Sequence, residues 1–248
     1  MLAGIEFKSF GILVTIGILC GWQWCRFRAK ELKVSDDDIT LLAALVLATG
    51  IFSAHVIQVV FYHPDMIDRD GPVVLLQVWK GLSSFGGFLG AFAGLWIYKL
   101  KKKRPVFRDA EITVEGLVIG WVFGRLGCTF ADDHKGPRTD FVLGFVYPEG
   151  GRHNLGFYEF LYTLAVLVPT VLILRKRRAP TGTLTMWLAF LYGIPRFIAD
   201  FFRATDIPGA DIRYLGLTFA QYADLGLIGL GVALAFTMRS RTPKALRA

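Results

Sequence analysis

Residues 124–159 read GRLGCTFADDHKGPRTDFVLGFVYPEGGRHNLGFYE, and the interpretation of the whole chain follows from this stretch. It begins inside one apolar run and ends inside the next, yet charged and histidine side chains are dense along it. Charge inside a hydrophobic segment is costly, so ionisable residues there indicate a functional site. We therefore expect this stretch to form the outer rim of the active site of a membrane enzyme.

The composition around this stretch is that of an integral membrane protein. Hydrophobic residues make up 54% of the 248 residues, and the mean hydropathy is +0.47, too apolar for a soluble domain of this size. The formal net charge is +8, and most of the 28 Lys and Arg residues fall in four clusters, at residues 26–33, 99–108, 175–178 and 239–247. Because these clusters alternate with connections that lack them, they follow the positive-inside pattern, which explains the basic charge without any nucleic acid.

Seven apolar spans approach the length of about 20 residues that a helix needs to cross a bilayer. They are residues 7–25, 40–62, 82–100, 111–130, 157–174, 183–202 and 219–238. We therefore expect an all-α fold, with one integral-membrane domain over residues 1–248 built as a seven-transmembrane-helix bundle. With the basic clusters in the cytoplasm, the C-terminus is cytoplasmic and the N-terminus is periplasmic in a bacterial inner membrane. The outward connections are then residues 63–81, 131–156 and 203–218.

Small residues recur at four-residue spacing in two of these spans. Gly86, Gly90 and Gly94 share one face of the third span, and Gly120 and Gly124 share a face of the fourth. Small residues at this spacing let helix backbones approach closely in lipid. We expect these five glycines to serve helix packing.

Three arginines near the outer ends of spans are candidates for binding an anion. Arg125 lies about fourteen residues, or roughly 21 Å, along its span from the cytoplasmic end, so it needs an anionic partner. Arg196, Asp200 and Arg203 follow at i, i+4 and i+7, on one helix face. They form either a structural ion network or a site in which two arginines exceed one carboxylate and bind a phosphate, whose oxygens match a guanidinium fork.

Two histidines on the outer connection are candidates for proton transfer. His134, beside Asp133, is the candidate base, because an imidazole near its usual pKa accepts a proton at neutral pH. A solvated loop histidine is the alternative. His153 either orients the loop or acts on the substrate.

Glu159 and Cys128 each admit a structural and a functional interpretation. Glu159 falls in the first turn of the fifth span, where it stabilises the helix dipole, pairs with Arg125 or Arg196, or takes part in catalysis. Cys128 is a nucleophile or a packed thiol; with Cys20 and Cys25 it makes no disulfide framework. No spacing typical of metal ligands is present in the sequence, and we expect the protein to need no metal or cofactor.

Taken together, these motifs resemble the prolipoprotein diacylglyceryl transferase family. The runs GRLGCTFADDHKG and RHNLGFYE, the earlier VWKGLSSFGGFLGA and the later YGIPRFIADFFR and LTFAQ occur in the family's order over nearly the whole chain. That family transfers the diacylglyceryl group of phosphatidylglycerol to the lipobox cysteine thiol of a lipoprotein precursor and releases glycerol phosphate. The resemblance implies phosphatidylglycerol, lipoprotein precursors and the lipid bilayer as partners.

The resemblance also implies roles for individual residues. Arg125 matches the essential arginine of the family signature, Arg196 matches that of the sixth helix, and Asp200 stands where the family usually has glutamate. Further pattern positions are Gly136, His153, Tyr158, Glu159 and Gln221. Together with the residues identified above from the sequence alone, the expected catalytic residues are Arg125, Arg196, His134, His153 and Asp200, and the expected substrate-binding residues are Arg125, Arg203, Glu159, Cys128, Gly136 and Gln221.

Three positions depart from the family pattern. The histidine-glycine-glycine of the third helix is here Phe85-Gly86-Gly87, the tyrosine of the first helix is Phe10, and the signature asparagine is Cys128. Either His134, with Asp133, has taken over proton transfer, or the fold serves another lipid reaction. The competing hypotheses are a related transferase with a different acceptor and a non-catalytic lipid-binding membrane protein.

Overall fold

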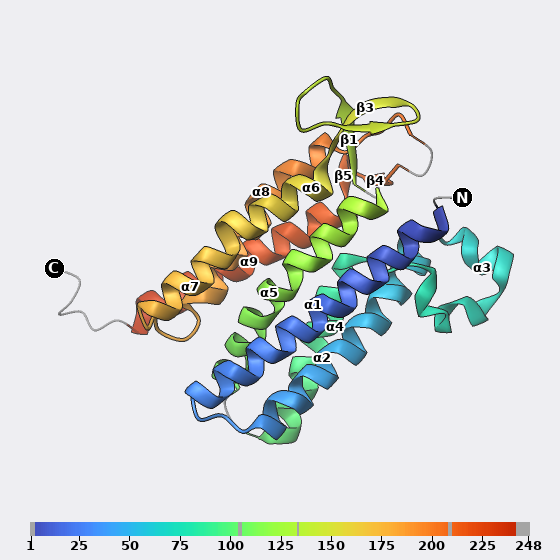
Figure 1. Ribbon diagram of the computed structural model, residues 1–248. Helices are drawn as coiled ribbons and strands as arrows, with labels where there is room; N and C mark the ends of the chain where they lie inside the picture. The colour runs from blue at the N-terminus through green and yellow to red at the C-terminus, as the bar shows by residue number, and fades with distance from the viewer. Residues whose placement is uncertain (1–2, 104–105, 133, 208–209, 242–248) are drawn as a thin grey trace. The chain divides into compact units, whose positions relative to one another are not determined.

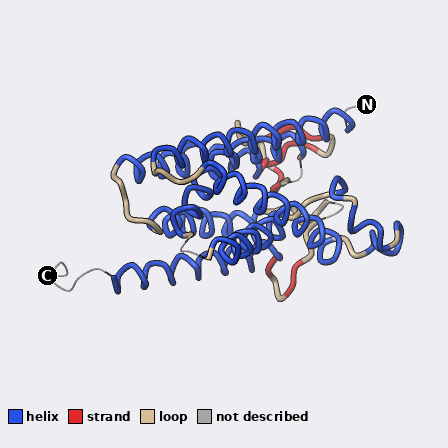
Figure 2. Tube along the Cα trace, turned by 90° about the horizontal axis from the view of Figure 1, so that it is seen from below, coloured by secondary structure: helices blue, strands red, loops and turns tan. Residues whose placement is uncertain are grey.

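A computed structural model describes residues 3–103, 106–132, 134–207 and 210–241, and most of them are helical (Figures 1 and 2). Every predicted span coincides with a helix. The helices at these positions are α1 (Ala3–Glu31), α2 (Asp36–Ile57), α4 (Ser84–Lys102), α5 (Phe107–Ala131), α6 (Leu155–Tyr162) with α7 (Val168–Lys176), α8 (Thr183–Ala199) and α9 (Phe219–Arg241). The prediction of a helical protein is thus confirmed.

Among the described residues, five helices are long and apolar enough to cross a membrane. They are Ser9–Glu31, Asp36–Tyr62, Phe107–Ala131, Leu155–Lys176 and Phe219–Arg239. The second contains a π-helical turn at Gln58–Tyr62 after α2, and the fourth contains one at Thr163–Leu167 between α6 and α7. Helices α4 and α8 occupy the two remaining predicted spans, so the full count of seven crossings stays a prediction.

The outward connections contain strands and short helices, which corrects the all-α prediction. Residues 135–154 form an antiparallel sheet in the order β1-β3-β2, from β1 (Lys135–Arg138), β2 (Phe145–Tyr147) and β3 (Gly150–Asn154). A second pair joins β4 (Arg213–Tyr214) to β5 (Leu217–Thr218). Helix α3 (Asp65–Asp70) and 3₁₀ turns at Pro72–Leu76 and Val78–Lys80 fold the first connection. Buried backbone groups in these connections need partners, and local pairing supplies them.

The chain divides into two compact units. Unit 1 comprises Met1–Cys25, Val114–Ala210 and Asp224–Ala248, and unit 2 comprises Arg26–Thr113 and Asp211–Ala223. The expected single domain stays a prediction. The residues of the candidate site fall almost entirely in unit 1.

In unit 1, glycines bring α1 and α5 into backbone contact. A Cβ at Gly120 would lie 2.7 Å from the carbonyl oxygen of Gly17, and one at Gly21 would lie 2.6 Å from that of Gly116. The predicted packing role of Gly120 is therefore confirmed. A Cβ at Gly124 would meet no described atom within 4 Å, so the same prediction for Gly124 is wrong. A buried apolar cluster also joins α5, the turn after α6, α7 and α8, and consists of Val118, Leu167, Val171, Leu184 and Leu188.

In unit 2, the glycines of α4 face α2 as predicted. A Cβ at Gly90 would lie 2.2 Å from the carbonyl oxygen of Thr49, and at Gly86 and Gly94 a Cβ would also overlap α2. His55 of α2 is fully buried, and its two ring nitrogens lie 2.9 Å and 2.7 Å from the carbonyl oxygens of Gly81 and Val74. These contacts tie the folded connection before α4 to α2.

Candidate active site

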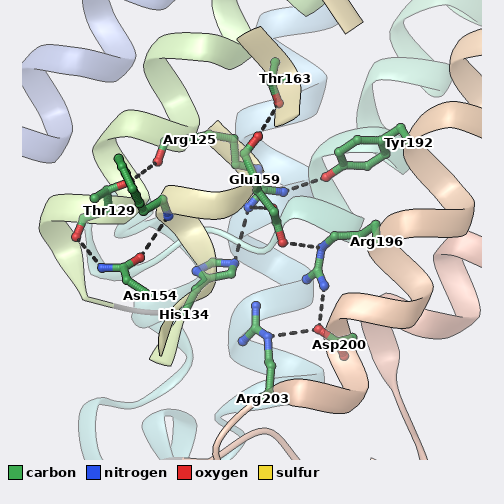
Figure 3. A network of polar contacts seen from close by, with 11 residues as sticks. Arg125, Thr129, His134, Asn154, Glu159, Thr163, Tyr192, Arg196, Asp200 and Arg203 are labelled. Carbon is green, nitrogen blue, oxygen red and sulfur yellow. Dashed lines mark hydrogen bonds and ion pairs between the residues drawn. The ribbon is translucent and has the colours of Figure 1, made fainter. Parts of the chain in front are cut away.

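Arg125 is the centre of a buried polar network in unit 1 (Figure 3). Only 2% of it is exposed. Its Nη1 lies 2.7 Å from Oε2 of Glu159 on α6, and its Nη2 donates a hydrogen bond of 2.6 Å to the hydroxyl of Tyr192 on α8. Its guanidinium carbon lies 4.7 Å from the centre of the Trp121 ring. A carboxylate, a hydroxyl and a π face thus compensate the buried cation.

The network continues from Glu159 along α8. Arg196 Nε lies 3.3 Å from Glu159 Oε1, and Arg196 Nη1 donates a hydrogen bond of 2.6 Å to Asp200 Oδ1. Arg203 Nε lies 2.9 Å from the same Asp200 oxygen. Each carboxylate therefore serves two arginines, and the network contains three guanidinium groups and two carboxylates.

The end of α8 explains how Asp200 reaches both arginines. Arg196 and Asp200 are one helical turn apart, which places their side chains on the same face. The chain then tightens into a 3₁₀ turn at Asp200–Phe202, and that turn brings Arg203 back toward Asp200. The ion network that the sequence allowed at these positions is present.

His134 lies beside Arg125, so the structure joins the candidate base to the arginines. Its Nε2 is 3.3 Å from Arg125 Nη1. A guanidinium can only donate, so Nε2 is the acceptor in this contact. The backbone carbonyl of His134 also accepts a hydrogen bond of 2.8 Å from the Leu155 amide, at the start of α6. Asp133, the predicted helper of His134, lies outside the described residues.

Asn154 fixes the start of α6 and so the position of Glu159 one turn later. Its Oδ1 accepts a hydrogen bond of 2.9 Å from the Phe157 amide, which makes it the N-cap. Its Nδ2 donates to the carbonyl oxygen of Thr129 at 3.0 Å and to the Tyr147 hydroxyl at 2.9 Å. One buried amide therefore connects α6, the end of α5 and the small sheet.

Three other predicted site residues lie on β3, β1 and α5. His153 Nδ1 lies 2.6 Å from the Tyr158 hydroxyl, and its ring lies near Phe141. Gly136 is buried, and a Cβ there would lie 3.2 Å from the His153 carbonyl oxygen, so glycine allows β1 to pack on β3. Cys128 lies on α5 three residues after Arg125 and forms no disulfide.

Gln221 belongs to unit 2, where it caps α9. Its Oε1 accepts a hydrogen bond of 2.9 Å from the Thr218 amide, and the Gln221 amide donates one of 3.2 Å to Thr218 Oγ1. This reciprocal pair is a capping box. The contacts thus give Gln221 a structural role at the start of the helix.

Aromatic packing occupies two positions that depart from the family pattern. Phe85 packs edge-on against Phe219, with ring centres 5.4 Å apart in unit 2. Phe10 lies against Gly127 in unit 1, where a Cβ would lie 3.0 Å from the Phe10 ring. Phe85 thus packs against another aromatic ring, and Phe10 packs against the α5 backbone at Gly127.

The small sheet is attached to the segment that follows α8. Buried Arg152 donates hydrogen bonds of 2.9 Å and 2.7 Å to the two carboxylate oxygens of Asp206, and the Ala204 amide donates to the Lys135 carbonyl oxygen at 2.9 Å. The Arg152 hydrogen bonds lower the pKa of the Asp206 carboxyl. Burial raises the pKa of the Tyr147 hydroxyl, which hydrogen-bonds Asn154. This attachment places His134 beside the network.

Sequence reasoning missed Trp121, Tyr192 and Asp224. Trp121 and Tyr192 each precede a site arginine by four residues, so helical spacing places them on the same face as Arg125 and Arg196. That spacing was a usable signal. Asp224 is an acidic residue within an apolar span, which is itself a signal of function.

The fold and the site define a class of helical membrane protein in which buried arginines and carboxylates meet near the ends of several helices. A family model described as prolipoprotein diacylglyceryl transferase matches residues 1–237, so the chain belongs to that family and is a transferase. Family membership and the apolar helices indicate a protein of the bacterial inner membrane.

Two relatives illustrate the similarity. A phosphatidylglycerol–prolipoprotein diacylglyceryl transferase from Francisella tularensis subsp. holarctica is 27% identical over 250 residues, which cover 98% of this chain and 93% of the relative. One of the same name from Nitratidesulfovibrio vulgaris is 29% identical over 245 residues, covering 94% and 90%. The similarity therefore extends over nearly the full length of each chain.

Proposed function

We propose that this transferase moves the diacylglyceryl group of phosphatidylglycerol to the lipobox cysteine thiol of a lipoprotein precursor. The observation that carries the proposal is the line of three guanidinium groups and two carboxylates in unit 1. Taken by themselves, these five groups hold one positive charge in excess, in a layer where charge is poorly solvated. A lipid phosphate supplies the matching negative charge, and its oxygens fit guanidinium forks.

Each group of the network has a role in this proposal. Arg125, Arg196 and Arg203 bind the phosphate and stabilise the negative charge that grows on it as glycerol phosphate leaves. Glu159 and Asp200 orient the arginines, because each carboxylate contacts two of them. Cys128 and Gly136 complete the substrate-binding set in unit 1, whereas Gln221, which the sequence also assigned to that set, caps α9 in unit 2. A group at the site must also accept the thiol proton, and His134 and His153 are the histidines that the sequence offers.

The topology of the proposal follows the basic clusters. The helices cross the membrane seven times, with the N-terminus in the periplasm and the C-terminus in the cytoplasm. The arginines then lie toward the outer leaflet, where they meet a phospholipid headgroup and the exported end of a lipoprotein precursor.

Complementation tests the proposal. The parent chain, Arg125→Ala, His134→Ala and the control Arg69→Ala are expressed in a bacterial strain depleted of its own diacylglyceryl transferase. Arg69 is an exposed arginine that pairs with Asp65 on α3, in unit 2. We expect rescue by the parent chain and by Arg69→Ala, and loss of rescue in Arg125→Ala and His134→Ala.

Purified protein separates the competing hypotheses. Labelled phosphatidylglycerol is incubated with the protein and a lipobox peptide, and lipid on the peptide and released glycerol phosphate are both measured. Release of glycerol phosphate without lipid on this peptide would indicate a transferase with a different acceptor. Retention of the lipid without turnover would contradict the proposal and favour a lipid-binding protein.

A further inference from the structure

Asp224 on α9 is a buried acid in unit 1 that the proposed mechanism does not use. It is 5% exposed, and its Oδ2 is buried without a hydrogen-bond partner among the described residues. Leaving a buried carboxylate oxygen without a donor is costly. A buried polar atom without a partner requires an explanation, and a catalytic role is one such explanation.

The surroundings of Asp224 are those of the candidate site. A Cβ at Gly193 would lie 3.3 Å from the Asp224 carbonyl oxygen, so this turn of α9 packs on the turn of α8 that carries Tyr192 and Arg196. Gly193 and Arg196 are three residues apart, so they share a face of α8. Asp224 therefore belongs to the same cluster as the proposed phosphate-binding arginines.

Each of the two histidines already has one ring nitrogen engaged in a contact. His134 Nε2 already accepts from Arg125, so protonation there would break this contact and place a second cation beside the guanidinium. His153 Nδ1 is engaged with the Tyr158 hydroxyl at 2.6 Å. The Oδ2 of Asp224 can accept a proton without breaking any hydrogen bond that the structure contains.

We propose that Asp224 is the proton acceptor for the thiol, an inference that rests on the proposed function and names its base. The thiol proton passes to an Asp224 carboxylate oxygen, and the sulfur lone pair forms a C–S bond with the terminal glyceryl carbon of the lipid. The C–O bond to phosphate breaks, and its electron pair stays on the phosphate oxygen of the departing glycerol phosphate. The proton then leaves Asp224 for water or for the product phosphate.

Charge supports this order of events. With Asp224 ionised, three carboxylates balance the three guanidinium groups of the cluster. When Asp224 takes the proton, one positive charge is restored just as the departing phosphate gains a negative charge. The two changes stabilise each other, which is how a base beside an anion-binding site contributes to catalysis.

A change of nucleophile tests the assignment. Transfer is measured with phosphatidylglycerol in detergent micelles and with lipobox peptides that carry either cysteine or selenocysteine. A selenol is largely ionised at neutral pH, so it needs no base. We expect Asp224→Asn to lose about 10²- to 10⁴-fold in kcat with the cysteine peptide. With the selenocysteine peptide, most of that loss should disappear.

Asp200→Asn is the matched control, because it makes the same chemical change in the same cluster at a residue that positions arginines. It should lose activity equally with both peptides. The assignment of Asp224 would be overturned if Asp224→Asn lost activity equally with the two peptides. It would also be overturned if the selenocysteine peptide restored activity in His134→Gln instead. Neither outcome would contradict the proposed function. Absence of transfer by the parent chain with either peptide would overturn the proposed function and this assignment with it. Thermal unfolding reports whether each variant folds, and Asp224→Ser repeats the comparison with a smaller side chain.

Discussion

Glu159 Oε2 lies 2.7 Å from Arg125 Nη1, although the two residues belong to different helices and are separated by the whole outer sheet. Both side chains are largely buried. The same carboxylate also faces Arg196, so it sets the spacing of two guanidinium groups. The position of Arg125 relative to Arg196 therefore depends on Glu159, and a substitution of Glu159 measures this dependence.

Glu159→Gln should reduce both activity and stability. The amide keeps the shape of the side chain but removes the charge that holds two buried guanidinium groups. Breaking a buried ion pair on one side costs about 3–5 kcal/mol. Misplacing the arginines by about 1 Å costs on the order of 10²-fold in transfer rate. Thermal unfolding in detergent and the peptide transfer assay measure the two effects.

Glu149→Gln is the control for this variant, because Glu149 pairs with Lys135 on the partly exposed sheet. It should keep activity within about twofold, since exposed pairs contribute little. Full activity in Glu159→Gln would contradict the role of Glu159 in orienting the arginines.

Gly120→Ala should lower the stability of the protein and Gly124→Ala should raise it, although the two residues lie one turn apart on α5. A Cβ at Gly120 would overlap the Gly17 backbone, and forcing apart a packed contact costs about 1–3 kcal/mol. At Gly124 the added methyl meets open space, and alanine favours the helix by about 1 kcal/mol. Thermal unfolding of the two variants makes the comparison, and equal destabilisation would show that backbone contact is not the cause.

Phe85→His restores the histidine that the family has at this position, and it should not increase transfer. Phe85 packs on Phe219, so an imidazole there would lose an aromatic contact of about 0.5–1.5 kcal/mol. We expect transfer within about twofold of the parent chain and a lower unfolding temperature. An increase of tenfold or more in transfer would mean that a base at residue 85 still limits the reaction.

Acidification should loosen the outer sheet through Asp206. The folded protein lowers the pKa of Asp206 because Arg152 donates two hydrogen bonds to it. Its contribution is therefore complete above the unfolded aspartate pKa of about 3.9 and is lost as the pH falls through the lower folded value. Hydrogen exchange of residues 135–154, corrected for intrinsic rates, should increase below about pH 4.

Asp206→Asn should show faster exchange of the same residues already at neutral pH, with a smaller further change on acidification. Asp140→Asn is the control, an exposed aspartate on the same connection. Unchanged exchange in Asp206→Asn at neutral pH would mean that other contacts hold the sheet to the segment after α8.

The site could be predicted in part because its spacing is helical. Arg196 and Asp200 are one turn apart on α8, so sequence alone placed them together, and Asp200 does contact Arg196 and Arg203. Pairing of Glu159 with Arg125 or Arg196 was one of the interpretations that the sequence left open, and Glu159 contacts both arginines. Gln221 shows the limit of prediction from sequence. Its match to the family motif suggested substrate binding and did not indicate its capping contact with Thr218. Asp224 was overlooked because it has no helical-spacing partner among the arginines.

The sequence by itself determined the helices, their apolar character and the presence of charged residues at their ends. Hydrophobicity and helical period are local properties that neighbouring residues fix. The tertiary structure decided which charges meet. Glu159 serves two arginines, the ring of His134 accepts from one of them, and an Asp224 oxygen has no donor among the described residues. These relations depend on contacts between helices that are far apart in the chain. Close packing of buried side chains sets those contacts, and a local sequence pattern does not encode it.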